Sequence, residues 1–111
     1  MAVPGLVVSK ERHPDALVVS VSGELDISTA TQLELEVRDL GDGSRLVLDL
    51  TELEFVDSTG LRTLVLTARA AANGCAFVCP SDNHAVQRLL EFFGVPDAYE
   101  VHETRAEAGL T

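Results

Sequence analysis

The 111-residue sequence is poor in lysine and in long apolar runs, and each shortage excludes a class of protein. Lys10 is the single lysine, and eight basic side chains stand against 18 acidic ones, which gives a formal net charge of −10. A nucleic-acid-binding domain needs clustered lysine and arginine, so the sequence predicts no nucleic-acid partner. No apolar run approaches the roughly 20 residues that cross a bilayer, and the first residues carry no cleavable export signal. We therefore expect a cytoplasmic protein without a membrane partner.

Cysteine is also scarce, and its spacing argues against cross-links and metal. Cys75 and Cys79 lie four residues apart in a strand-like segment, which places their Cα atoms about 13 Å apart, too far for a disulfide. The histidines His13, His84 and His102 form no cluster with them. The sequence therefore predicts two buried, reduced thiols, with no metal site and no cofactor.

The length and the apolar fraction of 46% indicate one compact domain, with its core at about 5–103 and a short tail or helix at 104–111. Apolar periodicity predicts strands at 6–9, 16–22, 45–50, 75–79 and 98–102. It predicts helices that begin near 29, 58 and 81, and a frayed last helix at 103–110. Strands alternating with helices predict an α/β fold: a mixed, mainly parallel sheet of about five strands, begun by an antiparallel hairpin and covered by helices.

For the first helix, which begins near 29, the sequence predicts the capping residue, the apolar stripe and one exposed side chain. Ser28 or Thr29 is expected to act as its N-cap. Its apolar stripe runs to Leu40, and the glycine-rich segment 41–43 ends it. Leu35 lies off this stripe and is expected to be exposed.

The sequence also predicts the ends and the buried side chains of the second and third helices, which begin near 58 and 81. The second is expected to end at a C-cap formed by 73–74, with Ala72 still on its buried stripe. Ser81 is expected to cap the third helix. On that helix we expect Phe93 to lie in the core and Phe92 to be an exposed contact residue.

The segment FVDSTGL at 55–61 places a serine at the N-terminus of a predicted helix, because a buried strand ends near Leu50 and a short loop leads to Ser58. A helix N-terminus carries unpaired N–H groups and the positive end of the macrodipole, so it accepts a capping hydroxyl or a phosphate. Two interpretations stay open from these residues: Ser58 is an N-cap and Gly60 eases packing, or Ser58 is a phosphate acceptor. A phosphoryl group would add about −1.5 to −2 charges beside Asp57 and alter binding rather than folding.

In the second interpretation the helix itself is expected to hold the phosphate. The backbone N–H groups of Thr59, Gly60 and Leu61 lie in the first turn and are the predicted donors.

Three motifs resemble the STAS domain family, and the likeness is strongest to the bacterial anti-sigma-factor antagonists. They are GELDISTA at 23–30, LVLDLTELEFVDSTGL at 46–61 and LLEFFGV at 89–95. The resemblance covers nearly the whole chain, so it implies a single STAS domain over 1–111. Within these motifs D-S-[ST]-G-L is the most specific, since GELD alone would be a weak signal.

The resemblance implies a partner-switching protein that is not an enzyme. In this family the unmodified domain binds an anti-sigma factor, itself a serine kinase of the histidine-kinase-like ATPase fold, and so releases a sigma factor. The kinase phosphorylates the serine directly after the aspartate, and a PP2C-type phosphatase removes the phosphate. We expect the chain to be a monomer or a weak dimer.

Ser58 occupies the position of the family's phosphorylated serine in the DSTGL motif, so the resemblance implies that Ser58 is the phosphate acceptor. Its expected neighbours are Asp26, Asp57, Thr59 and Gly60. Asp26, from GELD, is expected to lie near Ser58 and help to orient it. Thr59 stands where many relatives have a second serine, which leaves a second hydroxyl beside the acceptor.

The resemblance also implies a docking surface for the partner. It comprises four residues on the first turn of the second helix: Gly60, Leu61, Arg62 and Thr63.

Three other functions are weighed against this one. A hydrolase is disfavoured because there is no G-x-S-x-G elbow and no histidine with a place beside Ser58. A phospho-aspartate receiver would need a late lysine, whereas Lys10 is the only one, so Asp49 is better explained as a turn or capping residue. The remaining alternative is an unswitched STAS scaffold in a stress-sensing or lipid-transport complex. The intact DSTGL motif favours the switch.

Overall fold

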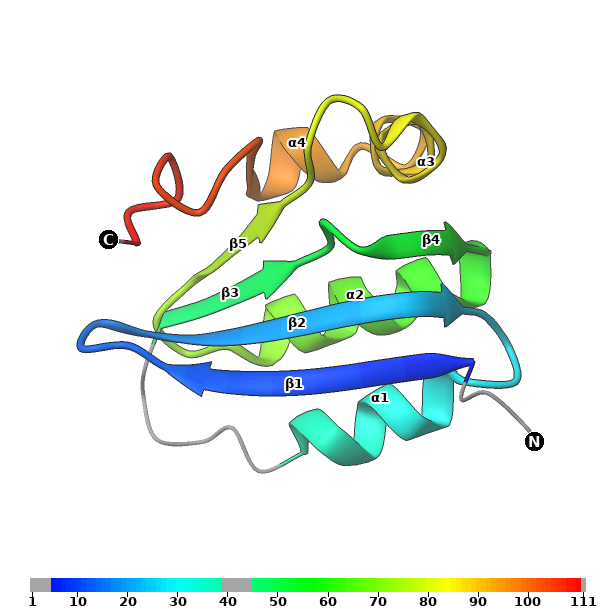
Figure 1. Cartoon of the computed structure of the whole chain (residues 1–111), viewed down its shortest axis with the longest axis horizontal. Helices are drawn as coiled ribbons and strands as arrows, with labels where there is room; N and C mark the ends of the chain where they lie inside the picture. The colour runs from blue at the N-terminus through cyan, green and yellow to red at the C-terminus, as the bar shows by residue number, and fades with distance from the viewer. Residues whose placement is uncertain (1–4, 39–44, 111) are drawn as a thin grey trace.

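A computed structural model describes residues 5–38 and 45–110 (Figure 1). Within these residues one mixed sheet is formed by six strands: β1 (Leu6–Arg12), β2 (Ala16–Leu25), β3 (Arg45–Asp49), β4 (Leu53–Val56), β5 (Cys75–Val78) and β6 (Glu100–His102). The strand order is β1-β2-β3-β5-β6, in which only the β1–β2 pair is antiparallel. The predicted α/β class, hairpin and mainly parallel sheet are confirmed, with six strands in place of about five.

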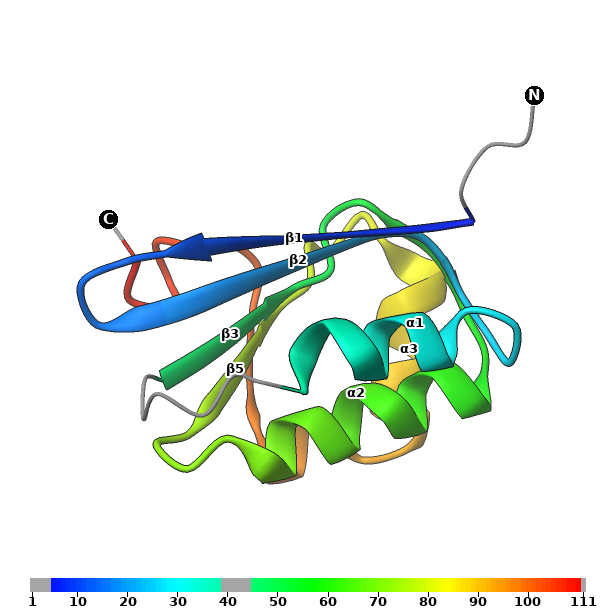
Figure 2. The same cartoon turned by 90° about the horizontal axis from the view of Figure 1, so that it is seen from below.

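The helices in the described part of the chain are α1 (Ala30–Val37), α2 (Ser58–Ala70), α3 (His84–Phe92) and α4 (Val95–Ala98). Figure 2 shows α1, α2 and α3 on the same face of the sheet. Their apolar side chains pack there against alternate residues of the central strands. The largest fully buried members of this core include Leu25, Leu33, Leu48, Leu61, Leu64, Phe77 and Leu90. None of the helices in the described ranges is both long enough and apolar enough to cross a bilayer.

β4 is a strand where the sequence predicts a loop. It pairs in parallel with the end of β2, past the point where β3 stops, and the register of this β2–β4 pairing shifts between Gly23 and Glu24. Leu53 and Val56 are buried at its ends, whereas its two middle residues are exposed. A four-residue strand with this pattern has no period of two, so its sequence carries no strand signal.

The helix termini differ from prediction in detail. Thr29 occupies the N-cap position of α1, but its hydroxyl donates to the Glu24 carbonyl and accepts from the Asp26 amide instead of capping the helix. α2 ends at Ala70, so Ala72 is exposed and the expected C-cap at 73–74 is wrong.

The predicted exposure of Leu35 on α1 is confirmed. Leu40 and 41–43, where the sequence predicts the end of this helix, lie outside the described residues.

α3 begins two residues later than predicted. Asn83, not Ser81, is its N-cap residue, and the Asn83 amide donates to the carbonyls of Leu50 and Leu53 instead of capping the helix. These bonds tie the start of α3 to the turn that precedes β4.

The two phenylalanines at the end of α3 have different outcomes. Phe92 is 81% exposed, as predicted. Phe93 is half exposed and packs edge-to-face on Phe92, so its predicted place in the core is wrong.

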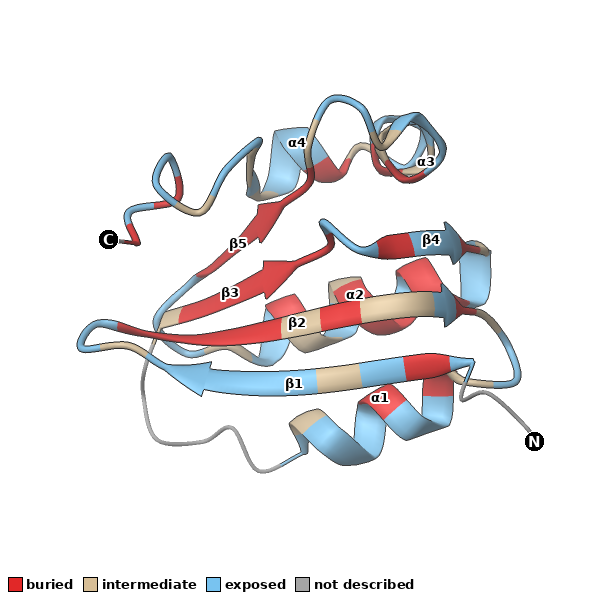
Figure 3. Cartoon of the chain, viewed as in Figure 1, coloured by how far each residue is buried: buried red, intermediate tan, exposed pale blue. Residues whose placement is uncertain are grey.

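The second face of the sheet is covered in part by the C-terminal segment. The predicted frayed helix at 103–110 is absent, and this stretch forms turns. Its side chains Ala108 and Leu110 are buried against the sheet, in a cluster with Ala16, Val18, Val47 and Val78. Figure 3 shows the contrast between the buried β3 and β5 and the largely exposed edge strand β1.

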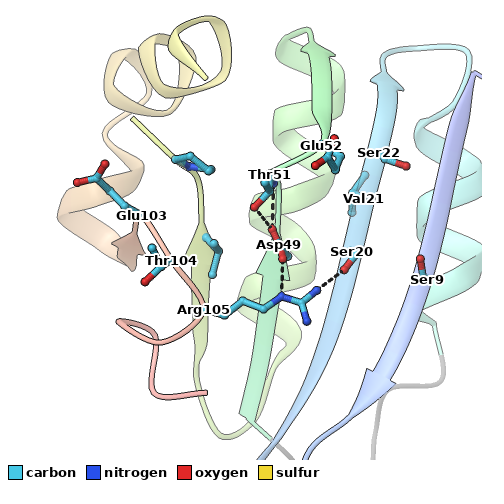
Figure 4. A pocket seen from close by; sticks show the side chains of 12 residues that line it. Ser9, Ser20, Val21, Ser22, Asp49, Thr51, Glu52, Glu103, Thr104 and Arg105 are labelled. Atoms are coloured by element: carbon cyan, nitrogen blue, oxygen red, sulfur yellow. Dashed lines mark hydrogen bonds and ion pairs between the residues drawn. The ribbon is translucent and has the colours of Figure 1, made fainter. Parts of the chain in front are cut away.

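Arg105 fastens this segment to three strands. Its Nε donates to Asp49 Oδ2 on β3 at 2.7 Å, its Nη1 to Glu11 Oε2 on β1 at 2.9 Å, and its Nη2 to Ser20 Oγ on β2 at 3.0 Å. Asp49 also accepts the Thr51 amide and hydroxyl, so its predicted turn role is confirmed. The ion pair to Arg105 is an additional role that sequence spacing does not indicate (Figure 4).

Candidate functional site

Ser58 is the first residue of α2 and lies exposed just after β4. The N-cap is its neighbour Asp57, whose Oδ1 accepts the Gly60 amide at 2.8 Å. The interpretation of Ser58 as the N-cap is therefore wrong, because Asp57 fills that role. The Ser58 hydroxyl consequently sits at an exposed helix start without serving as its cap.

Asp57 also joins α2 to the loop between β2 and α1. Its Oδ2 accepts the Ile27 amide at 3.2 Å, and its own amide donates to the Leu25 carbonyl at 3.2 Å. One carboxylate thus connects two segments that are about 30 residues apart in sequence. This connection fixes the position of Ser58 relative to the loop.

Asp26 shapes the loop itself. Its Oδ1 accepts the Ser28 hydroxyl at 2.6 Å and the amides of Ser28 and Thr29 at 2.9 and 3.2 Å. These hydrogen bonds, the Ser28 hydroxyl first, lower the pKa of Asp26 and keep it ionised. No bond from Asp26 to Ser58 occurs among the hydrogen bonds of the described residues; the loop reaches α2 through Ile27 and Asp57. An orienting role of Asp26 toward Ser58 stays a prediction.

Gly60 allows α2 to sit directly on the end of β2. A Cβ at this position would lie 2.3 Å from the Leu25 carbonyl oxygen and 2.8 Å from the Leu25 Cγ. Backbone therefore packs on backbone beneath the site, as the packing role assigned to Gly60 in the sequence requires.

The predicted docking surface needs correction. Gly60, Leu61 and Thr63 are buried, and of the four residues only Arg62 presents a side chain to solvent. Adjacent residues of a helix point about 100° apart, so a run of four consecutive residues cannot all lie on one outer face.

The exposed face of α2 is a different set. Ser58, Arg62 and Leu66 are exposed at spacings of four residues and so lie along one row, which we call the outer row. Ile27, in the loop held by Asp57, is 76% exposed. The helical period of α2 would have located Leu66, but nothing in the sequence distinguishes Ile27 from a core residue.

A hollow on the second face of the sheet is separate from this site. Its lining includes the hydroxyls of Ser9, Ser20 and Thr51 together with Asp49 and Arg105 (Figure 4). Ser58 is not part of its lining. Over the described ranges, no group of three or more histidine, cysteine, aspartate or glutamate side chains is arranged to hold a metal ion.

Comparison with known proteins gives consistent results. A family model described as Mlab, STAS domain, matches residues 8–101. An anti-sigma-B factor antagonist of Listeria monocytogenes is 34% identical over 103 residues, which cover 88% of this chain and 89% of that protein. The anti-sigma-F factor antagonist RsfB of Mycobacterium tuberculosis is 26% identical over 111 residues, with 97% and 91% covered.

A solved structure matches the whole fold. The crystal structure of an anti-sigma factor antagonist from Mycobacterium paratuberculosis superposes with a TM-score of 0.86 at 30% identity. The match covers 97% of this chain and 95% of that one. Sequence motifs, fold and relatives agree, and the chain belongs to the STAS domain family.

Proposed function

We propose that the chain is an anti-sigma-factor antagonist whose binding is switched off by phosphorylation of Ser58. The observation that carries this proposal is the exposed Ser58 hydroxyl at the first turn of α2, where Asp57 already serves as the N-cap. The hydroxyl is thus accessible to a kinase without loss of a helix cap. The relatives named anti-sigma-factor antagonists support the binding role.

In the unmodified state the partner would dock on the outer row and on the neighbouring loop. Leu66 and Ile27 offer apolar contacts and Arg62 offers a charge, all on segments held in place by Asp57 and by the packing of Gly60 on Leu25. A surface that is already ordered binds with little loss of conformational entropy.

Phosphorylation would act on this surface by charge. A phosphoserine carries about −1.5 to −2 charges at neutral pH, and here it would stand beside Asp57. A partner group that had packed against a neutral hydroxyl would then meet two adjacent anions and lose affinity. The partner in this scheme is an anti-sigma factor with serine-kinase activity, and a PP2C-type phosphatase restores the unmodified form.

The alternative is a STAS scaffold that binds without being switched. It uses the same fold and the same exposed loop, and differs only in leaving Ser58 unmodified. The two are distinguished by the state of Ser58 in the cell.

The first experiment is peptide mass spectrometry on the chain purified from its host, both growing and stressed. We expect phosphate on Ser58, with an occupancy that differs between conditions, and none after Ser58→Ala. Thr59→Ser is the matched control, because it retains the acceptor and changes only the neighbouring hydroxyl. A chain unmodified in every condition would favour the scaffold.

The second experiment measures binding to the host's anti-sigma kinase by calorimetry. Ser58→Ala should bind as the unmodified chain does, whereas Ser58→Asp should lose most of its affinity. Equal binding of both variants would exclude the switch.

A further inference from the structure

The start of α2 leaves few free donors to hold a phosphate on Ser58. The Gly60 amide donates to the Asp57 carboxylate, and the Leu61 amide donates to the Asp57 carbonyl at 2.9 Å. Two of the three amides expected to hold the phosphate are therefore already engaged. The Asp57 carboxylate beside the acceptor adds repulsion.

Arg62 is placed to supply a positive charge. It lies four residues after Ser58 on α2, on the same outer row, and both residues are exposed. Side chains at this spacing have Cβ atoms about 6 Å apart, and an anion placed N-terminal to a cation is the favoured order. Among the contacts of the described residues, Arg62 makes no hydrogen bond or ion pair that would have to be broken.

Lys10 and Arg105 are engaged in contacts of their own: Lys10 bonds Glu36, and Arg105 is held by its cluster on the second face. The next cation on α2 is Arg69, which lies about 16 Å from Ser58 along the helix axis at 1.5 Å per residue. Arg62 is thus the one cation of α2 within reach of the acceptor.

Resting on the proposed function, we propose that Arg62 is the counter-ion of the phosphoserine formed at Ser58. In the unmodified chain Arg62 faces solvent and is available to a partner. In the phosphorylated chain its guanidinium pairs with the phosphate across one helical turn, in a charge-assisted contact. Phosphorylation would then withdraw a positive charge from the outer row as well as adding a negative one.

The test places phosphoserine at position 58 during translation and titrates it by ³¹P NMR. The second ionisation of phosphoserine has a pKa of about 6. Because Arg62 favours the doubly charged form, the apparent pKa should be about 0.3 lower with Arg62 than in Arg62→Gln. The difference should shrink in about 1 M salt, where the Debye length is about 3 Å.

Two further variants sharpen the result. Arg69→Gln removes the same charge from the same helix at a distance and should titrate as the parent chain does. Arg62→Lys should retain part of the effect, because it keeps the charge and loses the planar fork. An Arg62→Gln titration that coincides with the parent, or an equal effect of Arg69→Gln, would overturn the proposal.

The experiment is independent of the proposed function. If the cell never phosphorylates Ser58, the switch fails while the titration result stands. If Ser58 is phosphorylated in the cell but the phosphoserine pKa is the same in the parent chain and in Arg62→Gln, the counter-ion proposal fails and the switch stands.

Discussion

The contact between Gly60 and Leu25 brings two backbones together beneath Ser58. With a Cβ at position 60, the carbonyl oxygen of Leu25 would lie only 2.3 Å away. Relief of such a contact requires movement of α2 or of the end of β2, because the obstructing atom belongs to the main chain. Glycine is therefore required here by space, not by dihedral freedom.

Gly60→Ala should lower the free energy of unfolding by about 3 kcal/mol, at the upper end of the cost of overpacking. Urea denaturation followed by circular dichroism measures this directly. Gly5→Ala is the matched control, since its Cβ would meet only the Thr29 Cγ2 at 3.4 Å and should change stability little. A Gly60→Ala variant as stable as Gly5→Ala would contradict the close packing.

At the level of single residues the sequence placed Ser58 at the start of α2, but it did not show which neighbours share its exposed face. The packing role of Gly60 was predicted from its place at the start of this helix, and it is confirmed. Leu61 and Thr63 were placed on the docking surface because they follow the serine in the motif, although the helical period turns them inward. Ile27 is exposed in a loop whose backbone is held by the Asp57 carboxylate, a tertiary contact that local sequence does not encode.

Among the elements, the C-terminal segment depends most on electrostatics. Burial alone would raise the pKa of Asp49, but hydrogen bonds from Thr51 and Arg105 outweigh it and hold that pKa below its usual range. The pKa of Glu11 is also lowered, chiefly by its hydrogen bond from Arg105. Carboxylates with lowered pKa values stabilise the fold above about pH 4, and this contribution is lost as the pH falls through their folded-state values.

Arg105→Gln should destabilise the chain by about 2 kcal/mol at pH 7, because it leaves the Asp49 carboxylate buried with fewer charge-assisted hydrogen bonds. Below about pH 4 the difference from the parent chain should shrink as the carboxylates become protonated. Thermal unfolding at pH 7 and pH 3 tests both statements. Arg88→Gln, on α3, is the control for removal of one arginine, and a pH-independent difference would refute the ion-pair explanation.

Element prediction succeeded where the local pattern was clear and failed where contacts are distant. The 13-residue α2 carries a clear apolar stripe, and β3 is a run of large aliphatic residues bounded by turn residues, so both were predicted. β4 has only four residues and owes its existence to pairing with β2. The Arg105–Asp49 pair joins residues 56 apart, so the segment that contains Arg105 was mistaken for a helix.

At the scale of the whole molecule, the sheet separates two differently built faces. Helices cover one face, and their buried side chains form the main core with the sheet. Both cysteines belong to this core. Burial raises the pKa of Cys75 to about 12 and that of Cys79 to about 11. Both thiols are free, as predicted, and neither is ionised near neutral pH.

Labelling with a thiol reagent at pH 8 should therefore be slow in the native chain and rapid for two thiols in guanidinium chloride. Since both cysteines lie in the core, the native rate should follow the unfolding equilibrium and rise in parallel with destabilisation by Gly60→Ala. Ellman's reagent provides the measurement. Rapid labelling of either cysteine in the folded chain would show local opening of β5 or of the residue that follows it.

β2 pairs with β1, β3 and β4, and its last residue lies under Gly60. Separating the loop and helix at the site would disturb a strand shared by three partners, so we expect such an opening to be rare. A binding partner consequently meets a surface that is formed before the encounter. The association rate should then be set by diffusion and charge, with no slow rearrangement of this chain to wait for.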